Sequence, residues 1–239
     1  MARASRSEHY RREVSRVEGF SDAVFAFAIT LLVVSLEVPK TFEELMAAIR
    51  GFPAFAVCFA LLFQVWWRHY RFFRSYDLED GPVIAMTGLL LFVVLFYVYP
   101  LKFLWSMFFA QFDPRLVRGD AIRIDQFPAL FEIYGLGVAA VFGILAAMYG
   151  HAYRHRGDLD LTPIEVVDTR IDVYRNLSIG GIGLVSVVTA AVLSRIAPHL
   201  IGLAGYVYFL IGIAEWALGD YNGRLRRRVA ANTTDTSPA

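Results

Sequence analysis

Long apolar stretches separated by short charged segments dominate this chain. A helix that crosses the hydrocarbon layer of a bilayer needs about 20 largely apolar residues. Six windows of that kind, bounded by charge, Pro or Gly, run approximately Glu18–Val38, Leu45–Trp67, Pro82–Phe109, Pro128–Tyr153, Tyr174–Ile196 and Pro198–Ala217. They lack the alternation of barrel strands, and backbone groups in lipid must be bonded within their own segment. The pattern therefore predicts an all-α integral membrane bundle of six transmembrane helices.

Composition supports lipid as the solvent of these segments. The chain of 239 residues is 57% hydrophobic and 19% charged, which is too apolar for an ordinary soluble domain of this length. Its single cysteine, Cys58, lies in an apolar run, so neither an internal disulfide nor a cysteine metal cluster is available. Nothing in the charge pattern indicates a nucleic-acid partner.

The distribution of Lys and Arg predicts the orientation. Most of them lie in the N-terminal segment, after the second span, after the fourth span and in the C-terminal segment. These four segments share one side of the membrane, so the positive-inside rule predicts that both termini are cytoplasmic. We expect a cytoplasmic segment at 1–15, a transmembrane domain at 16–221, and a basic, then disordered tail at 222–239. A capping-box pattern at 162–165 predicts a short cytoplasmic helix before the fifth span.

Charged residues open the first span, where an apolar helix would be expected. Arg16, Glu18 and Asp22 all lie there, and ionisable groups at that depth need partners. The second span ends at the same side with Trp66 and His69, so these side chains are predicted to meet Arg16 and Asp22. Helix termination and interfacial anchoring are the competing interpretation of the second-span residues.

These residues carry a resemblance to a known family. It rests on Arg16-x-x-x-Phe20-Ser21-Asp22, followed by an apolar run to Glu37, and on Trp66-x-x-His69-x-x-x-Phe73 in the second span. The first and second motifs are similar to those of the transmembrane protein 175 family of potassium channels. The resemblance implies a prokaryotic six-span form in the cell membrane, assembled as a homotetramer, whose pore is lined by the first helix without a carbonyl filter loop.

One seam of the first helix fits such a pore. Ala23, Phe27, Thr30, Val34 and Glu37 are spaced four, three, four and three residues apart. With the resemblance, we expect stacked rings: a hydrophobic gate at Phe27 with Val34 and Ala23, a selectivity ring at Thr30, and an acidic outer mouth at Glu37. The family usually has an aliphatic residue where this chain has Phe27. Ordinary helix packing is the alternative explanation of such a seam.

The remaining motif residues are expected to support the first helix. This structural network comprises Arg16, Phe20, Ser21, Asp22, Trp66 and His69. No catalytic residue, metal ligand or cofactor is expected, and the partners are potassium ions, membrane lipid and further copies of the chain.

Three other functional classes remain open from the residues alone: a membrane enzyme, a proton-coupled transporter and a purely structural membrane protein. A membrane enzyme is weakly indicated, because the five histidines form no close metal-ligand pattern, and His151-x-x-x-His155 lies in an arginine-rich inner loop. A proton-coupled transporter would use Asp22 and His69 as its relay. Lys102, just after Pro100 in the third span, either extends its ammonium toward the interface or faces an internal cavity.

Overall fold

The computed structural model describes residues 15–34, 38–113, 115 and 126–235, without the side chains of Val34 and 228–235. Its elements in chain order are α1 (Arg16–Val34), α2 (Phe42–Arg50), α3 (Phe52–Tyr76), α4 (Gly81–Ala110), α5 (Phe127–Arg154), α6 (Pro163–Ile196), η4 (Pro198–Leu200), α7 (Leu203–Tyr206), η5 (Val207–Phe209) and α8 (Leu210–Asp235). The described residues form helices, turns and loops and no strand, which confirms the all-α prediction.

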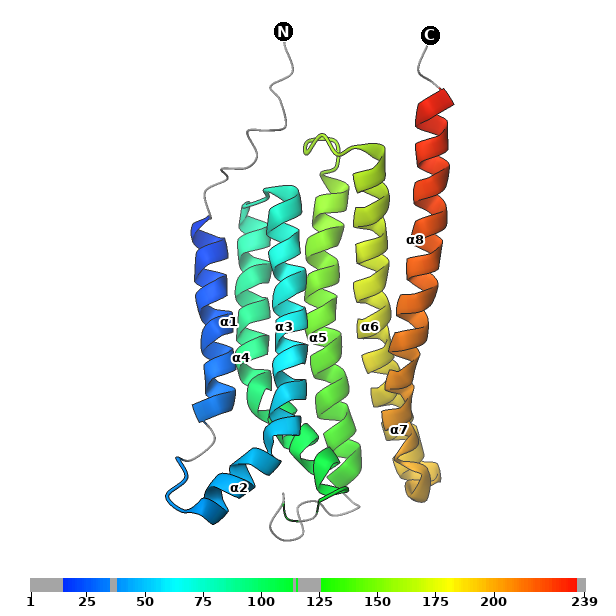
Figure 1. Cartoon of the computed structure of the whole chain (residues 1–239). Helices are drawn as coiled ribbons and strands as arrows, with labels where there is room; N and C mark the ends of the chain where they lie inside the picture. The colour runs from blue at the N-terminus through cyan, green and yellow to red at the C-terminus, as the bar shows by residue number, and fades with distance from the viewer. Residues whose placement is uncertain (1–14, 35–37, 114, 116–125, 236–239) are drawn as a thin grey trace.

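The long helices run side by side as an elongated bundle (Figure 1). α1 lies at one edge against α3 and α4, and α8 lies at the opposite edge against α6. The start of α1 and the end of α8 share one end of the bundle, as expected for both termini on one side of a membrane. At the other end, α2 leaves the bundle axis, because the chain bends by 44° between α2 and α3.

Length and composition support fewer spans than six. Four described helical segments are long and apolar enough to cross a membrane, and α2 with α3 makes a fifth if the bent pair counts as one span. α1 would be the sixth, but its 19 residues include the charged Arg16, Glu18 and Asp22. The count of six therefore stays a prediction that depends on α1.

Local capping explains where the helices begin. Asp80 accepts a hydrogen bond from the Val83 N–H and Pro82 follows it, so α4 begins at Gly81. The predicted capping box is present, since Thr162 and Glu165 bond reciprocally to each other's backbone N–H groups. The separate short helix predicted there is wrong, because no breaker interrupts the chain and α6 continues to Ile196.

Two further span boundaries were predicted incorrectly. The second span was expected to begin at Leu45, but a turn at Gly51 ends the short helix α2 and α3 begins at Phe52. The segment expected as the sixth span begins with the short helical turns η4, α7 and η5, and the long helix α8 begins only at Leu210. α8 then continues to Asp235, so the described part of the predicted tail, residues 222–235, lies within this helix.

Close helix contact builds the core between α5 and α6. A Cβ added to Gly183 would lie 2.7 Å from the Gly135 carbonyl oxygen, so only glycine allows this approach. Farther along α5, Leu145 and Met148 are fully buried in one hydrophobic core with Phe72 of α3. This rigid packing positions α3, whose other side contacts α1.

Candidate functional site

The helix α1 has one buried face and one uncovered face. Phe25, Ala28 and Leu32 are at most 1% exposed and pack toward α3 and α4. On the opposite face Phe27 is 57% exposed, and Ala23 and Thr30 are also exposed. Three residues of the predicted seam thus form a continuous stripe that a single chain leaves uncovered.

The Thr30 side chain is oriented by its own helix. Its hydroxyl donates to the Phe27 carbonyl oxygen at 2.7 Å, with the Ala26 carbonyl oxygen at 3.3 Å. A hydroxyl has one donor and two acceptor lone pairs. Because the proton is directed into the helix, the lone pairs remain available to a ligand that needs oxygen donors, such as a cation.

Two members of the seam cannot be placed. Glu37 lies outside the described residues. Val34 ends α1, but its side chain is also outside what the structure describes. The predicted outer rings of the pore therefore stay predictions.

Near the start of α1, Asp22 and Trp66 meet. The Trp66 indole N–H donates to Asp22 Oδ1 at 2.8 Å, which joins α1 to α3. Ser21 is fully buried and its hydroxyl donates to the Val17 carbonyl oxygen at 2.7 Å. The side chains of both motif residues are thus hydrogen-bonded, that of Asp22 to another helix and that of Ser21 within α1.

The structure does not join the other expected members to this pair. His69 is 1% exposed, lies between Phe25 and Phe73, and its Nε2 has no partner among the described residues. Arg16 is exposed and forms no hydrogen bond or ion pair within the described chain. Phe20 is 64% exposed.

Lys102 reaches the other end of α1. Its Nζ donates to the Leu32 carbonyl oxygen, 3.4 Å away, in the last turn of that helix. A cation at a helix C-terminus complements the partial negative charge there. Lys102 therefore connects α4 to α1, which neither sequence-based alternative described.

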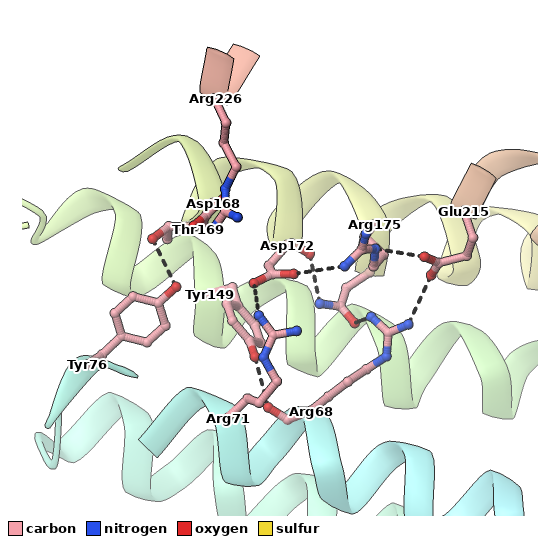
Figure 2. A network of polar contacts seen from close by, with 11 residues as sticks. Arg68, Arg71, Tyr76, Tyr149, Asp168, Thr169, Asp172, Arg175, Glu215 and Arg226 are labelled. Atoms are coloured by element: carbon pink, nitrogen blue, oxygen red, sulfur yellow. Dashed lines mark hydrogen bonds and ion pairs between the residues drawn. The ribbon is translucent and has the colours of Figure 1, made fainter. Parts of the chain in front are cut away.

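A second polar network joins α3 to α6 and α8 (Figure 2). Arg68 Nη2 donates to Glu215 Oε1 at 2.9 Å. Arg175 Nε lies 2.7 Å from Glu215 Oε2 as an ion pair, without hydrogen-bond geometry. One carboxylate on α8 therefore contacts two guanidinium groups on different helices.

The same network continues along α6. Asp172 lies 3.1 Å from Arg71 and 3.4 Å from Arg175, and the Tyr149 hydroxyl donates to the Arg68 carbonyl oxygen at 2.9 Å (Figure 2). Sequence reasoning missed this network. Its available signal was the pair of acidic and basic residues spaced three apart on α6, opposite two arginines with the same spacing on α3.

The histidine pair at the C-terminal end of α5 makes other contacts. His151 Nε2 lies 2.6 Å from Asp80 Oδ2, and His155 Nδ1 lies 3.1 Å from the His151 carbonyl oxygen. Across the ranges that the structure describes, no group of three or more His, Cys, Asp or Glu is arranged to hold a metal ion.

Comparison with known proteins shows the family to which this chain belongs. Residues 16–97 match the model of the family described as endosomal/lysosomal potassium channel TMEM175. A potassium channel from Marivirga tractuosa is 38% identical over 91% of each chain. Another, from Chamaesiphon minutus, is 35% identical over 37% of this chain and 47% of its own.

Solved structures give the same result. A crystal structure of a variant of the potassium channel MtTMEM175, bound to a nanobody fusion protein, superposes with a TM-score of 0.78 at 35% identity. It covers 90% of this chain and 95% of that one. The resemblance inferred from the two motifs is therefore confirmed: this chain belongs to the TMEM175 family of potassium channels.

Proposed function

We propose that this chain forms a potassium-selective cation channel in a prokaryotic cell membrane, with both termini cytoplasmic. Four copies would surround a pore lined by α1. The observation that carries this proposal is the uncovered stripe of Ala23, Phe27 and Thr30 on a helix whose opposite face is packed against α3 and α4. Because the stripe lies at the edge of the bundle, a conduit lined by it requires other copies.

Each ring of side chains would have its own task. Phe27 forms the gate with Ala23 and Val34, because a narrow apolar constriction closes a pore by dewetting. Thr30 presents hydroxyl oxygens that replace part of the hydration shell of the ion. Glu37 raises the local cation concentration at the outer mouth.

The polar motif residues would keep α1 in register with the bundle. The Asp22–Trp66 hydrogen bond fixes the inner part of α1 to α3, and buried Ser21 and His69 fill the space behind it. Arg16 and Phe20 would belong to the same network, although both are exposed in the single chain and Arg16 forms no hydrogen bond or ion pair with a described residue. These residues act on the position of the pore helix, so no catalytic step and no cofactor is proposed.

The experiment is potassium flux from liposomes that hold the purified protein and a potassium gradient. Thr30→Val should shift the reversal potential toward that of a less potassium-selective pore. Thr189→Val is the matched control, because Thr189 also donates to its own helix, on α6. An unchanged reversal potential for Thr30→Val would count against the selectivity ring.

The gate is tested in the same liposomes. Phe27→Ala should raise the conductance, because the constriction loses its ring; a current no larger than the parent's would point to another gate. Saturable flux driven by a proton gradient, in place of passive ion-selective current, would favour the transporter that uses Asp22 and His69. Against that relay, Asp22 Oδ1 accepts from Trp66, and no described hydrogen bond joins Asp22 to His69.

A further inference from the structure

The placement of α1 implies which surfaces neighbouring subunits present to each other. α1 contacts α3 on one flank, through Trp66 and Asp22, and contacts α4 on the other. If the uncovered stripe of α1 faces a central axis, as the proposed function requires, the α3 flank of one subunit meets the α4 flank of the next. Such a contact joins two different surfaces, and repeated around an axis it closes a ring.

The α4 flank carries a groove. Its volume is about 260 Å³, and it is lined mainly by apolar atoms of α1 and α4, including Arg16, Phe20, Ile84, Thr87, Gly88 and Leu91. A Cβ added to Gly88 would meet nothing within 4 Å, so the groove is open at that point. We call this feature the α1–α4 groove.

Two polar groups in the α1–α4 groove lack partners within the part of the chain that is described. Thr87 is 2% exposed and its hydroxyl forms no hydrogen bond. Arg16, at the inner rim, forms no ion pair or hydrogen bond with a described residue. The Arg16 guanidinium is exposed, so a group outside this chain can reach it at the rim of the groove.

The α3 flank carries a complementary surface. Six aromatic side chains follow one another along it, with consecutive ring centroids 5.1 to 6.3 Å apart: Phe55, Phe59, Phe63, Trp66, Trp67 and Tyr70. Phe59, Phe63 and Trp67 are each at least 40% exposed in the single chain. We call this row the aromatic ladder.

The two surfaces lie at matching depths. α3 runs toward the inner end of the bundle and α4 runs away from it, since the turn at Asp77–Asp80 joins them. Trp67 lies nine residues before the end of α3 at Tyr76, about 13 Å along the helix. Gly88 lies seven residues after the start of α4 at Gly81, about 10 Å along it.

We propose that the aromatic ladder of one subunit docks into the α1–α4 groove of its neighbour, with Trp67 against Gly88. The occupant is a second copy of this chain. Arg16 at the rim then lies against the ring faces of Trp67 and Tyr70, where a cation is attracted by the aromatic quadrupole. The missing Cβ of Gly88 leaves room for the indole, and each subunit supplies one ladder and one groove.

Cysteine cross-linking in membranes tests the pairing. In a Cys58→Ala background, which removes the one native cysteine, Trp67→Cys combined with Gly88→Cys should form covalent dimers, trimers and a closed tetramer under mild oxidation. The matched control replaces Gly88→Cys by Leu89→Cys, since Leu89 is 52% exposed at the same depth but beside the groove. Each single cysteine variant should stay uncross-linked.

Other cross-linking patterns would overturn the proposal. Equal yields from the Gly88 and Leu89 pairs would show that the groove is not the contact. Dimers from a single variant would show a two-fold interface in place of a ring. If the Gly88 pair forms no cross-link in protein that still has the wild-type assembly mass, lipid and not a neighbouring subunit fills the groove.

A second variant tests the groove without cysteine. Gly88→Leu should fill the groove and lower the mass of the detergent-solubilised assembly, with loss of potassium flux. Gly181→Leu on α6 is its control, because a Cβ at either glycine meets nothing within 4 Å and both chains should fold. Wild-type mass for Gly88→Leu would overturn this interface, whereas the pore proposal would still be judged separately by Thr30→Val in the intact assembly.

Discussion

Glu215 connects the C-terminal helix to two other helices, and its replacement tests whether this contact is a buried ion pair. Its carboxylate oxygens lie 2.9 Å from Arg68 and 2.7 Å from Arg175. The Arg68 side chain is only 12% exposed, and that of Glu215 is 30% exposed. The change is Glu215→Leu, which keeps apolar volume and removes the carboxylate.

The expected cost follows from the guanidinium groups left behind. Removing one partner of a buried ion pair costs about 3–5 kcal/mol, because the remaining charge stays desolvated. Water reaches part of Glu215, so the lower value of about 3 kcal/mol applies. In a chain of this size each kcal/mol lowers the melting temperature by about 2–4 °C, so we expect a fall of about 6–12 °C.

Thermal unfolding in detergent, followed by tryptophan fluorescence at one protein concentration, measures this change. Asp220→Asn is the control, because Asp220 pairs with Arg224 on an exposed helix face, and such pairs contribute only about 0.3–0.5 kcal/mol. The double variant Arg68→Met with Glu215→Leu should be less destabilised than the sum of its parts. Equal shifts for Glu215→Leu and Asp220→Asn, or full additivity, would refute the reasoning.

Two further outcomes are expected. Trp66→Phe removes the hydrogen bond to Asp22 and should cost up to about 1.5–3 kcal/mol, since the acceptor is charged; an equal shift for the exposed Trp216→Phe would argue that the bond contributes nothing. Burial by itself raises the pKa of Asp80. The hydrogen bonds from His151 and the Val83 N–H, together with the nearby imidazoles, lower it by more, so the pKa of Asp80 in the folded protein lies below its usual value. Ionised Asp80 therefore stabilises the folded state at pH values above its pKa in the unfolded chain, and this stabilisation is lost as the pH falls through its lower pKa in the folded protein. Asp80→Asn should remove this pH dependence from melting curves recorded below about pH 5.

The pattern of apolar and charged residues along the chain was sufficient to predict features that depend on a single helix. The apolar windows placed α4 and α5 to within a residue or two, because Pro, Asp80 and charge mark their ends. The 4-3-4-3 spacing placed Ala23, Phe27 and Thr30 on one face of α1, and the structure has all three exposed there. The expectation that the start of span one lies beside the end of span two also sufficed to bring Asp22 and Trp66 together.

Contacts that depend on helix rotation were beyond such reasoning. Arg68 and Trp66 are two residues apart, so they leave α3 in different directions, one toward α8 and the other toward α1. Which direction holds a partner depends on how α6 and α8 pack, and no local pattern encodes that. Asp172 lies just before the predicted start of the fifth span at Tyr174 and made that span look shorter than α6, although Arg71 on α3 and Arg175 on α6 pair with its carboxylate.

The length of α6 has a practical consequence for imaging. Its 34 residues extend about 51 Å, whereas the hydrocarbon layer is about 30 Å thick. About 20 Å of continuous helix therefore stands clear of the acyl chains, beginning at the capped Thr162 end. An antibody fragment or fused marker attached there would be held by a continuous helix beyond the detergent belt, where it could guide the alignment of single-particle images.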